Sequence, residues 1–182
     1  DLLRLSHPGG DAAHTALYDY ICRGETNRDF PDLVDAFEEV QRATTVQGWL
    51  GALANPNLSW EMLPDAALSE PDVWRALLDN GIPQTALMRQ LPRLTRLGVL
   101  SGNYATLVAE QLADGERLKK ARVHPINVLV AQRTYASGAS ARGESTWTPI
   151  PRISDALDAA FYNAFAAVEP ANKRTLLALD VS

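Results

Sequence analysis

The sequence contains a single cysteine, Cys22, among its 182 residues, which excludes an internal disulfide and a cysteine-built metal site. No apolar run approaches the roughly 20 residues that span a bilayer, and the first residues lack the basic start and apolar stretch of a signal peptide. These absences favour a cytoplasmic protein that does not enter a membrane. With 46% hydrophobic and 21% charged residues, the chain differs from disordered proteins and can bury a sizeable core.

Signatures of an enzyme are missing as well. The three histidines, His7, His14 and His124, show no metal-ligand spacing, and the sequence contains no nucleophile-elbow motif. Paired acids such as Glu38 and Glu39 fall on amphipathic segments, where a solvated helix face explains them. We therefore expect no catalytic residues and no enzymatic activity.

Helical spacing dominates the chain before residue 175. Apolar residues recur every three or four positions in segments of about 10 to 20 residues, most of them bounded by proline, glycine or serine. Pro92 lies inside the segment that Pro83 opens, and we expect it to kink or divide that helix. The pattern favours an all-α fold of stacked helical hairpins, an α-solenoid, although it contains no clean fixed-period repeat. An ordinary helical bundle fits the pattern equally well.

The two ends of the sequence predict that it is part of a longer protein. Residues 1–6 are typical of the last turns of an amphipathic helix, and the run TLLALDVS at 175–182 is typical of a buried parallel strand without partner strands. Such a strand delivers the carboxylate of Asp180 and the hydroxyl of Ser182 to the top of an α/β sheet, where hard oxygen ligands suit Mg²⁺. By itself this pattern is weak.

Charge is uneven along the chain, although the formal net charge is only −5. Residues 1–84 hold 5 Lys and Arg against 14 Asp and Glu, whereas residues 85–142 hold 9 against 3. Residues 143–182 hold 3 against 5. A basic middle region of this kind is typical of a surface that binds a polyanion.

Two groups of basic residues make up most of this middle region. The first, the arginine stripe, consists of Arg89, Arg93 and Arg96, whose spacing places them on one helix face. The second, the 117–124 cluster, consists of Arg117, Lys119, Lys120, Arg122 and His124. A solvated helix face and a phosphate-binding surface both explain such groups. The scarcity of interleaved acids and the bidentate fork of arginine support phosphate binding, with little base reading because aromatic residues are not interleaved with the basic ones.

Six stretches of the chain resemble the Ro autoantigen family, RNA-binding proteins in which a TROVE module precedes a von Willebrand factor A domain. They are LLRLSH at 2–7, DVWRALL at 72–78, TALMRQL at 85–91, LKKARVHP at 118–125, ALDAAFYNAF at 156–165 and VEPANKRTLLALDVS at 168–182. The composition is typical of a bacterial or phage member. The resemblance implies that residues 1–170 are the C-terminal part of the TROVE module, a HEAT-like α-solenoid closed into a ring. Residues 171–182 would then be the first strand of the A domain.

The resemblance also implies RNA as the partner. Ro proteins bind small noncoding Y RNAs and the ends of misfolded or structured RNAs, for RNA quality control, maturation or decay, and bacterial members associate with polynucleotide phosphorylase, an exoribonuclease. His7 matches a family histidine implicated in Y RNA binding, and we expect Arg4 to share its face. Asp180 and Ser182 match the first two residues of the family's D-x-S-x-S motif, so a divalent cation, Mg²⁺, is expected in the complete parent protein. A protein–protein scaffold without direct RNA binding is the alternative function.

Overall fold

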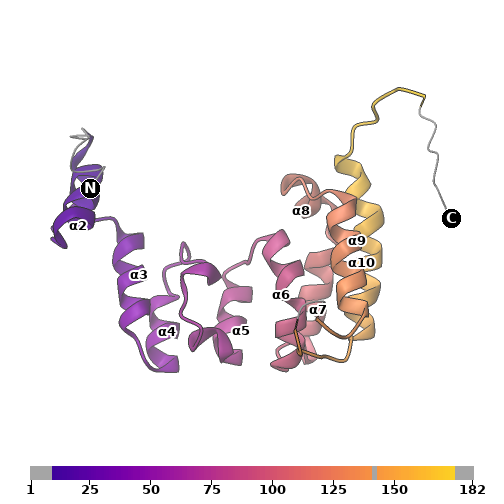
Figure 1. Ribbon diagram of the computed structural model, residues 1–182, viewed down its shortest axis with the longest axis horizontal. Helices are drawn as coiled ribbons and strands as arrows, with labels where there is room; N and C mark the ends of the chain where they lie inside the picture. The colour runs from indigo at the N-terminus through magenta and orange to yellow at the C-terminus, as the bar shows by residue number, and fades with distance from the viewer. Residues whose placement is uncertain (1–9, 141–142, 175–182) are drawn as a thin grey trace. The chain divides into compact units, whose positions relative to one another are not determined.

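The computed structural model describes residues 10–140 and 143–174, which fall into two compact units, Asp1–Ile82 and Pro83–Ser182 (Figure 1). Within these described residues there are helices and one isolated antiparallel bridge, between Ala139 and Thr146, but no strand. The prediction of an all-α fold is therefore confirmed over this part of the chain. Several predicted features lie outside the described residues: Arg4, His7, Asp180, Ser182 and the terminal strand.

The described part of the first unit contains four α-helices and two short 3₁₀ helices. They are α2 (Ala12–Arg23), α3 (Asp32–Arg42), α4 (Val46–Ala52), η1 (Trp60–Met62), η2 (Ala67–Ser69) and α5 (Pro71–Asp79). Side-chain caps fix two helix starts, because Asp11 accepts the N–H of His14 and Thr45 accepts the N–H of Gly48. The hydrogen bond from the backbone of His14 also lowers the pKa of the Asp11 carboxyl.

Trp74 lies at the centre of the core of the first unit. Its side chain is fully buried, and its Nε1–H donates to the carbonyl oxygen of Leu68 over 2.9 Å. Its ring stacks on Trp60 with 6.4 Å between the ring centroids. α3 packs on α4 and α4 on α5, so that Val40 and Trp49 are buried as well. Large apolar side chains therefore hold the short helices of this unit together.

The second unit is built from two antiparallel hairpins. Its helices are α6 (Gln84–Arg96), α7 (Gly102–Ala113), α8 (Gly115–Lys120), α9 (Pro125–Ala136), α10 (Pro151–Ala164) and the 3₁₀ helix η3 (Phe165–Ala167). The amide of Gln84, at the start of α6, donates to the carbonyls of Gln111 and Leu112 at the end of α7. Gln132 of α9 likewise donates to Asp158 of α10 over 3.1 Å. α6–α7 and α9–α10 are thus the two hairpins.

The hairpins stack so that equivalent helices lie side by side and run in the same direction. The hydroxyls of Thr95 and Tyr135, both near the C-terminal ends of α6 and α9, are 2.9 Å apart. At the start of α10, Arg152 donates to Thr106 of α7. At the C-terminal ends of the same two helices, Asn163 donates to the carbonyl of Ala113 over 2.7 Å. Repetition of one hairpin beside the next is the arrangement of an α-solenoid.

Pro92 does not divide α6, contrary to one of the outcomes expected from the sequence. The helix continues from Gln84 to Arg96 with Pro92 inside it. Leu87, Leu91 and Leu94 are fully buried on its inner face, and this burial offsets the roughly 3 kcal/mol that an internal proline costs. Because proline has no N–H, the carbonyl of Met88 loses its usual intrahelical donor.

Candidate functional site

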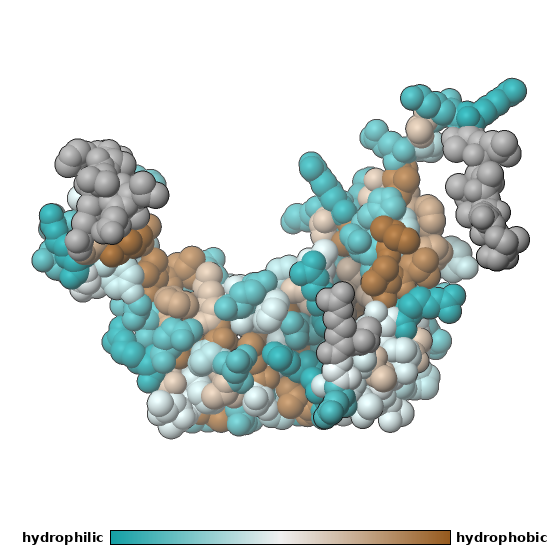
Figure 2. Space-filling model, viewed as in Figure 1, coloured by the Kyte–Doolittle hydropathy of each residue, from teal (hydrophilic) through white to brown (hydrophobic). Residues whose placement is uncertain are grey.

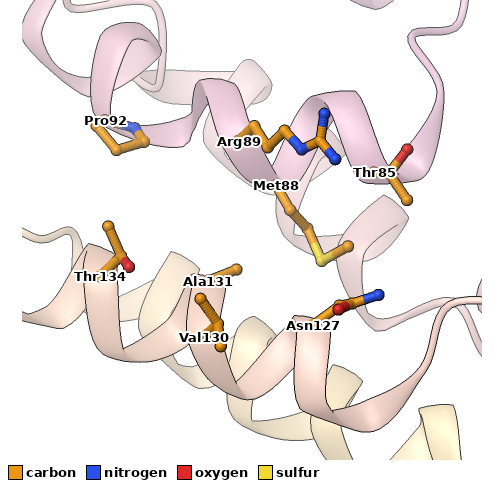
Figure 3. Close-up of a pocket in the computed structure, with 8 residues that line it drawn as sticks. All are labelled: Thr85, Met88, Arg89, Pro92, Asn127, Val130, Ala131 and Thr134. Atoms are coloured by element: carbon orange, nitrogen blue, oxygen red, sulfur yellow. The ribbon is translucent and has the colours of Figure 1, made fainter.

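A groove with a volume of about 400 Å³ separates α6 from α9 (Figure 3). Its lining residues are Thr85, Met88, Arg89, Pro92, Asn127, Val130, Ala131 and Thr134. In Figure 3 the side chain of Met88 points across the groove toward α9, whereas that of Arg89 lies along α6. The groove therefore combines apolar side chains with one guanidinium and three neutral polar side chains.

The arginine stripe lies along α6, as its spacing predicted, but its members differ in environment. Arg89 and Arg96 are exposed, and Arg93 is half-buried. Arg96 donates from Nη1 to Oγ of Ser145 over 2.8 Å and lines a second hollow together with residues 146–151. Arg89 thus faces the α6–α9 groove, while Arg96 joins α6 to the segment that follows α9.

The 117–124 cluster lies on α8 and the turn after it. The carboxylate of Asp114 caps α8 by accepting the N–H groups of Glu116 and Arg117, and it forms an ion pair with Arg117 at 3.5 Å. Lys119 and Lys120 are exposed in the last turn. Arg117 therefore has a local partner, whereas the two lysines extend into solvent.

His124 has a structural role that the sequence did not predict. It is the N-cap of α9, and its Nδ1 accepts the N–H of Ile126 over 3.2 Å. The cap requires Nδ1 without a proton, which leaves Nε2 as the ring nitrogen that can contact another molecule. The predicted binding role and this capping role are compatible.

Arg122 occupies a backbone conformation that favours glycine. Its φ is 50°, and the N–H groups of Arg122 and Val123 donate to the carbonyls of Lys119 and Leu118 in the pattern of a Schellman C-cap. α6 ends in the same way, but there Gly98, with φ 67°, holds the left-handed position. A side chain in this position costs about 1 kcal/mol, so α8 keeps a cation at the expense of stability.

Replacing Arg122 with glycine is expected to raise the free energy of unfolding of the second unit by up to about 1 kcal/mol. Urea denaturation of the two proteins measures this difference. The matched control is Gly98→Ala, which introduces a side chain at the equivalent position of α6 and should lower stability by a similar amount. A clear loss of stability in the Arg122→Gly protein would contradict the argument.

Nine exposed cations of the second unit lack a carboxylate partner in the part of the chain that the structure describes. The five that lie on the arginine stripe and in the 117–124 cluster are Arg89, Arg96, Lys119, Lys120 and Arg122, and the other four are Arg133, Arg152, Lys173 and Arg174. In the first unit, by contrast, Arg23, Arg28 and Arg75 each lie within ion-pair distance of a neighbouring Asp, and Arg42 is the one exposed cation of the described residues there without a carboxylate partner. The unpaired charges of the second unit remain available to an external anion.

Sequence reasoning missed a group of aromatic side chains beside the 117–124 cluster. α8 packs against α10 and η3, the helices that carry Phe161, Tyr162 and Phe165. The prediction that aromatic and basic residues are not interleaved is correct along the chain, but the fold brings them close together. The only signal was the spacing of four between Phe161 and Phe165, which indicates one helix face and no particular neighbour.

Neither a metal-binding cluster nor a membrane-spanning helix is present among the described residues. No group of three or more His, Cys, Asp or Glu side chains is placed to hold a metal ion within residues 10–140 and 143–174. No helix in those ranges is long and apolar enough to cross a membrane. Asp180 and Ser182 lie beyond them, so the predicted metal motif stays a prediction.

Comparisons with known proteins agree on one family. The model of the TROVE domain matches residues 51–134. The RNA-binding protein RO60 of Caenorhabditis elegans is 38% identical over 151 residues, which cover 83% of this chain and 24% of that protein. The RNA-binding protein RO60 of Deinococcus radiodurans is 39% identical over 190 residues, which cover 100% of this chain and 35% of that protein.

A solved structure shows the same fold. The crystal structure of the Deinococcus radiodurans Ro (RSR) protein matches with a TM-score of 0.83 and 35% identity, over 94% of this chain and 36% of that chain. The match confirms the fold class predicted from the resemblance, whereas the strand of a von Willebrand factor A domain stays a prediction. The chain spans about a quarter to a third of the length of the two curated relatives named above. By sequence, by domain and by fold, the chain is similar to the Ro proteins, and its residues 51–134 match the TROVE domain.

Proposed function

We propose that this chain is an RNA-binding segment of an Ro-type protein and that the exposed cations of its second unit contact RNA phosphates. The observation that carries the proposal is the absence of carboxylate partners for Arg89, Arg96, Lys119, Lys120 and Arg122 within the described residues. Two relatives named as RNA-binding proteins support it.

The groove between α6 and α9 suits a sugar–phosphate backbone. Arg89 supplies a planar fork that donates two hydrogen bonds to one phosphate. The side chains of Thr85, Asn127 and Thr134 are exposed along the same groove and can donate to phosphate or 2′-hydroxyl oxygens. Because the helices hold these groups in place, binding orders few side chains, and counterion release supplies much of the affinity.

Replacing Arg89, Arg93 and Arg96 together with glutamine tests the proposal. We expect weaker binding of a structured small RNA, and a plot of log K against log salt that is shallower by about 1.4 to 1.8, since Arg89 and Arg96 are the exposed members and each phosphate contact contributes roughly 0.7 to 0.9 to the slope. Fluorescence anisotropy at salt concentrations from about 50 to 200 mM, the range in which affinities for nucleic acid change strongly, measures both effects. The control replaces Arg23, Arg28 and Arg75, which carry the same charge but already have carboxylate partners.

If the salt slope is unchanged in the variant without Arg89, Arg93 and Arg96, or changes equally in the control variant, the arginine stripe is not part of the RNA-binding surface. Purification at low salt provides a second test. RNA binding predicts co-eluting nucleic acid with a high 260/280 absorbance ratio, whereas a purely protein-binding scaffold elutes without it.

The proposal extends to the whole parent protein. In the parent protein, the RNA partners are Y RNA and misfolded or structured RNAs, which are bound in the cytoplasm for quality control, maturation or decay. The protein itself is not an enzyme in this proposal. Polynucleotide phosphorylase or another exoribonuclease is the partner that degrades or trims the RNA. His7 and Arg4 belong to the Y RNA surface. Asp180 and Ser182 provide two ligands of a Mg²⁺ site whose remaining ligands follow in the parent sequence. The resemblance of His7, Asp180 and Ser182 to the family motifs supports their assignments, and Arg4 is included because its spacing of three from His7 puts both on one helix face.

A further inference from the structure

The segment between α9 and α10 holds a serine hydroxyl against one arginine of the arginine stripe. Nη1 of Arg96 donates to Oγ of Ser145 over 2.8 Å. Arg96 is exposed and has no carboxylate partner within the described residues. The hydroxyl is neutral, whereas a guanidinium forms its strongest hydrogen bonds with an anion. A negative charge placed on Ser145 would therefore find a cation already in position.

This serine lies in a surface segment that an enzyme can reach. Residues 143–150 form no helix and connect the lower ends of α9 and α10 in Figure 1. Figure 2 shows mostly hydrophilic and weakly polar side chains at these ends of the helices. Two backbone hydrogen bonds of 2.9 Å, from Ser140 to the carbonyl of Ser145 and from Trp147 to the carbonyl of Gly138, tie the segment to the end of α9. Surface connections of this kind are where proteins carry functional sites.

Space for a larger group is available beside the hydroxyl. An open hollow with a volume of about 590 Å³ is lined by Arg96, by Thr95 and by residues 146–151, which directly follow Ser145. A phosphoryl group adds three acceptor oxygens to a serine side chain. The hollow can receive these oxygens without displacing a buried side chain.

We propose that Ser145 is a phosphorylation site and that its phosphoryl group pairs with Arg96, which withdraws this arginine from RNA. The inference rests on the proposed function and adds a means of regulating it. A protein kinase supplies the group from a nucleoside triphosphate. Oγ forms a new bond to the γ-phosphorus, the bond from that phosphorus to the β–γ bridging oxygen breaks, a base of the kinase takes the hydroxyl proton, and a nucleoside diphosphate leaves.

Phosphorylation changes the contact from a neutral hydrogen bond into an ion pair. The phosphate carries a charge of about −1.5 to −2 at pH 7, and the planar fork of Arg96 can donate two hydrogen bonds to it. An arginine that is engaged in this way is no longer available to an RNA phosphate. The same pair holds residues 143–150 more firmly against α6.

Two other hydroxyls of the second unit lack this combination of features. Thr106 also accepts a hydrogen bond from an arginine, Arg152, but it lies inside α7, where the helix keeps the backbone from a kinase. Thr148 lies in the same segment as Ser145 and is exposed, but its hydroxyl contacts no guanidinium among the described residues. Thr148 therefore provides a matched control position.

The test uses the full chain with phosphoserine incorporated at position 145 by genetic-code expansion, with and without Arg96→Gln. Fluorescence anisotropy measures binding of a fluorescein-labelled RNA hairpin at several salt concentrations. In the otherwise unchanged chain, phosphorylation should make the plot of log K against log salt shallower by about 0.7 to 0.9, because one phosphate contact is lost. In the Arg96→Gln chain it should leave the slope as it was. Phosphoserine in place of Thr148 should change the slope by less.

Hydrogen exchange provides a readout that does not depend on RNA. The amide of Trp147 should exchange more slowly when position 145 is phosphorylated, and this effect should disappear with Arg96→Gln. If phosphorylation changes RNA binding equally with and without the Arg96 side chain and leaves exchange unchanged, the phosphate only repels RNA and the inference is wrong. Slower exchange in a chain that binds no RNA overturns the proposed function and leaves the phosphate–Arg96 pair intact.

Mass spectrometry tests whether the modification occurs. The protein is isolated from growing and from starved cells of its source, digested and fragmented. We expect a peptide that is heavier by one phosphoryl group, with the group on Ser145. Its absence under both conditions, or a phosphoryl group on Thr148 instead, overturns the assignment.

Discussion

Replacing Trp74 with alanine is expected to lower the free energy of unfolding of the first unit by about 3 to 5 kcal/mol. The indole is fully buried, and the substitution leaves a cavity against Trp60. It also leaves the carbonyl of Leu68 without the indole N–H that it accepts over 2.9 Å. Urea denaturation followed by circular dichroism measures the loss, and hydrogen exchange at α5 locates it in this unit.

Trp74→Phe is the matched variant, because it keeps a ring in the core and removes only the N–H and part of the volume. Its cost should be smaller than that of alanine, at about 1 to 3 kcal/mol. Surface substitutions usually change the free energy of unfolding by less than about 1 kcal/mol. A Trp74→Ala protein whose free energy of unfolding differs from that of the parent by no more than this would contradict the central place of Trp74 in the core.

Removing the hydroxyl of Tyr135 is expected to destabilise the second unit by about 1 to 3 kcal/mol. The side chain is 1% exposed, and its oxygen lies 2.9 Å from Oγ1 of Thr95 and accepts the N–H of Ile150 over 3.1 Å. A Tyr135→Phe variant leaves both partners without this bond and loosens the tie between α6, α9 and the start of α10. Faster amide exchange at Ile150, together with a lower urea midpoint, would show the effect.

Tyr162→Phe is the control for this experiment. It removes a hydroxyl from a tyrosine that is 67% exposed, so its stability should stay within about 0.5 kcal/mol of the parent. If the two substitutions have the same small effect, the Tyr135 hydroxyl does not hold the stacked hairpins together.

The helices could be predicted from the sequence because their apolar residues recur at helical spacing. For α6, Leu87, Leu91 and Leu94 identify one buried face, and the stripe of arginines identifies the other side. The continuity of the helix through Pro92 could not be predicted, because it depends on burial against α7 and α9. Local pattern predicts a helix, but the energy that overcomes a helix breaker comes from its neighbours.

Less of the candidate site could be predicted. Sequence spacing places basic residues on α6 and α8, but it does not show which of them have carboxylate partners. The left-handed backbone at Arg122 and the capping role of His124 depend on how the chain turns after α8. The aromatic side chains of α10 lie close to α8 only because the second hairpin stacks on the first. Contacts between residues so far apart in the sequence leave no short-range pattern.

The position of α8 between the two stacked hairpins has a consequence for how such proteins diverge. Each hairpin is a repeating unit whose core faces must match those of its neighbours, which restricts substitution. α8 belongs to neither hairpin, and its buried anchors are Leu118 and, directly after the helix, Val123. Provided that these two anchors are kept, its outward residues can be exchanged, or the segment lengthened, without a change in the stack. The connection between hairpins is therefore where the surface of the stack can change at the least cost to folding.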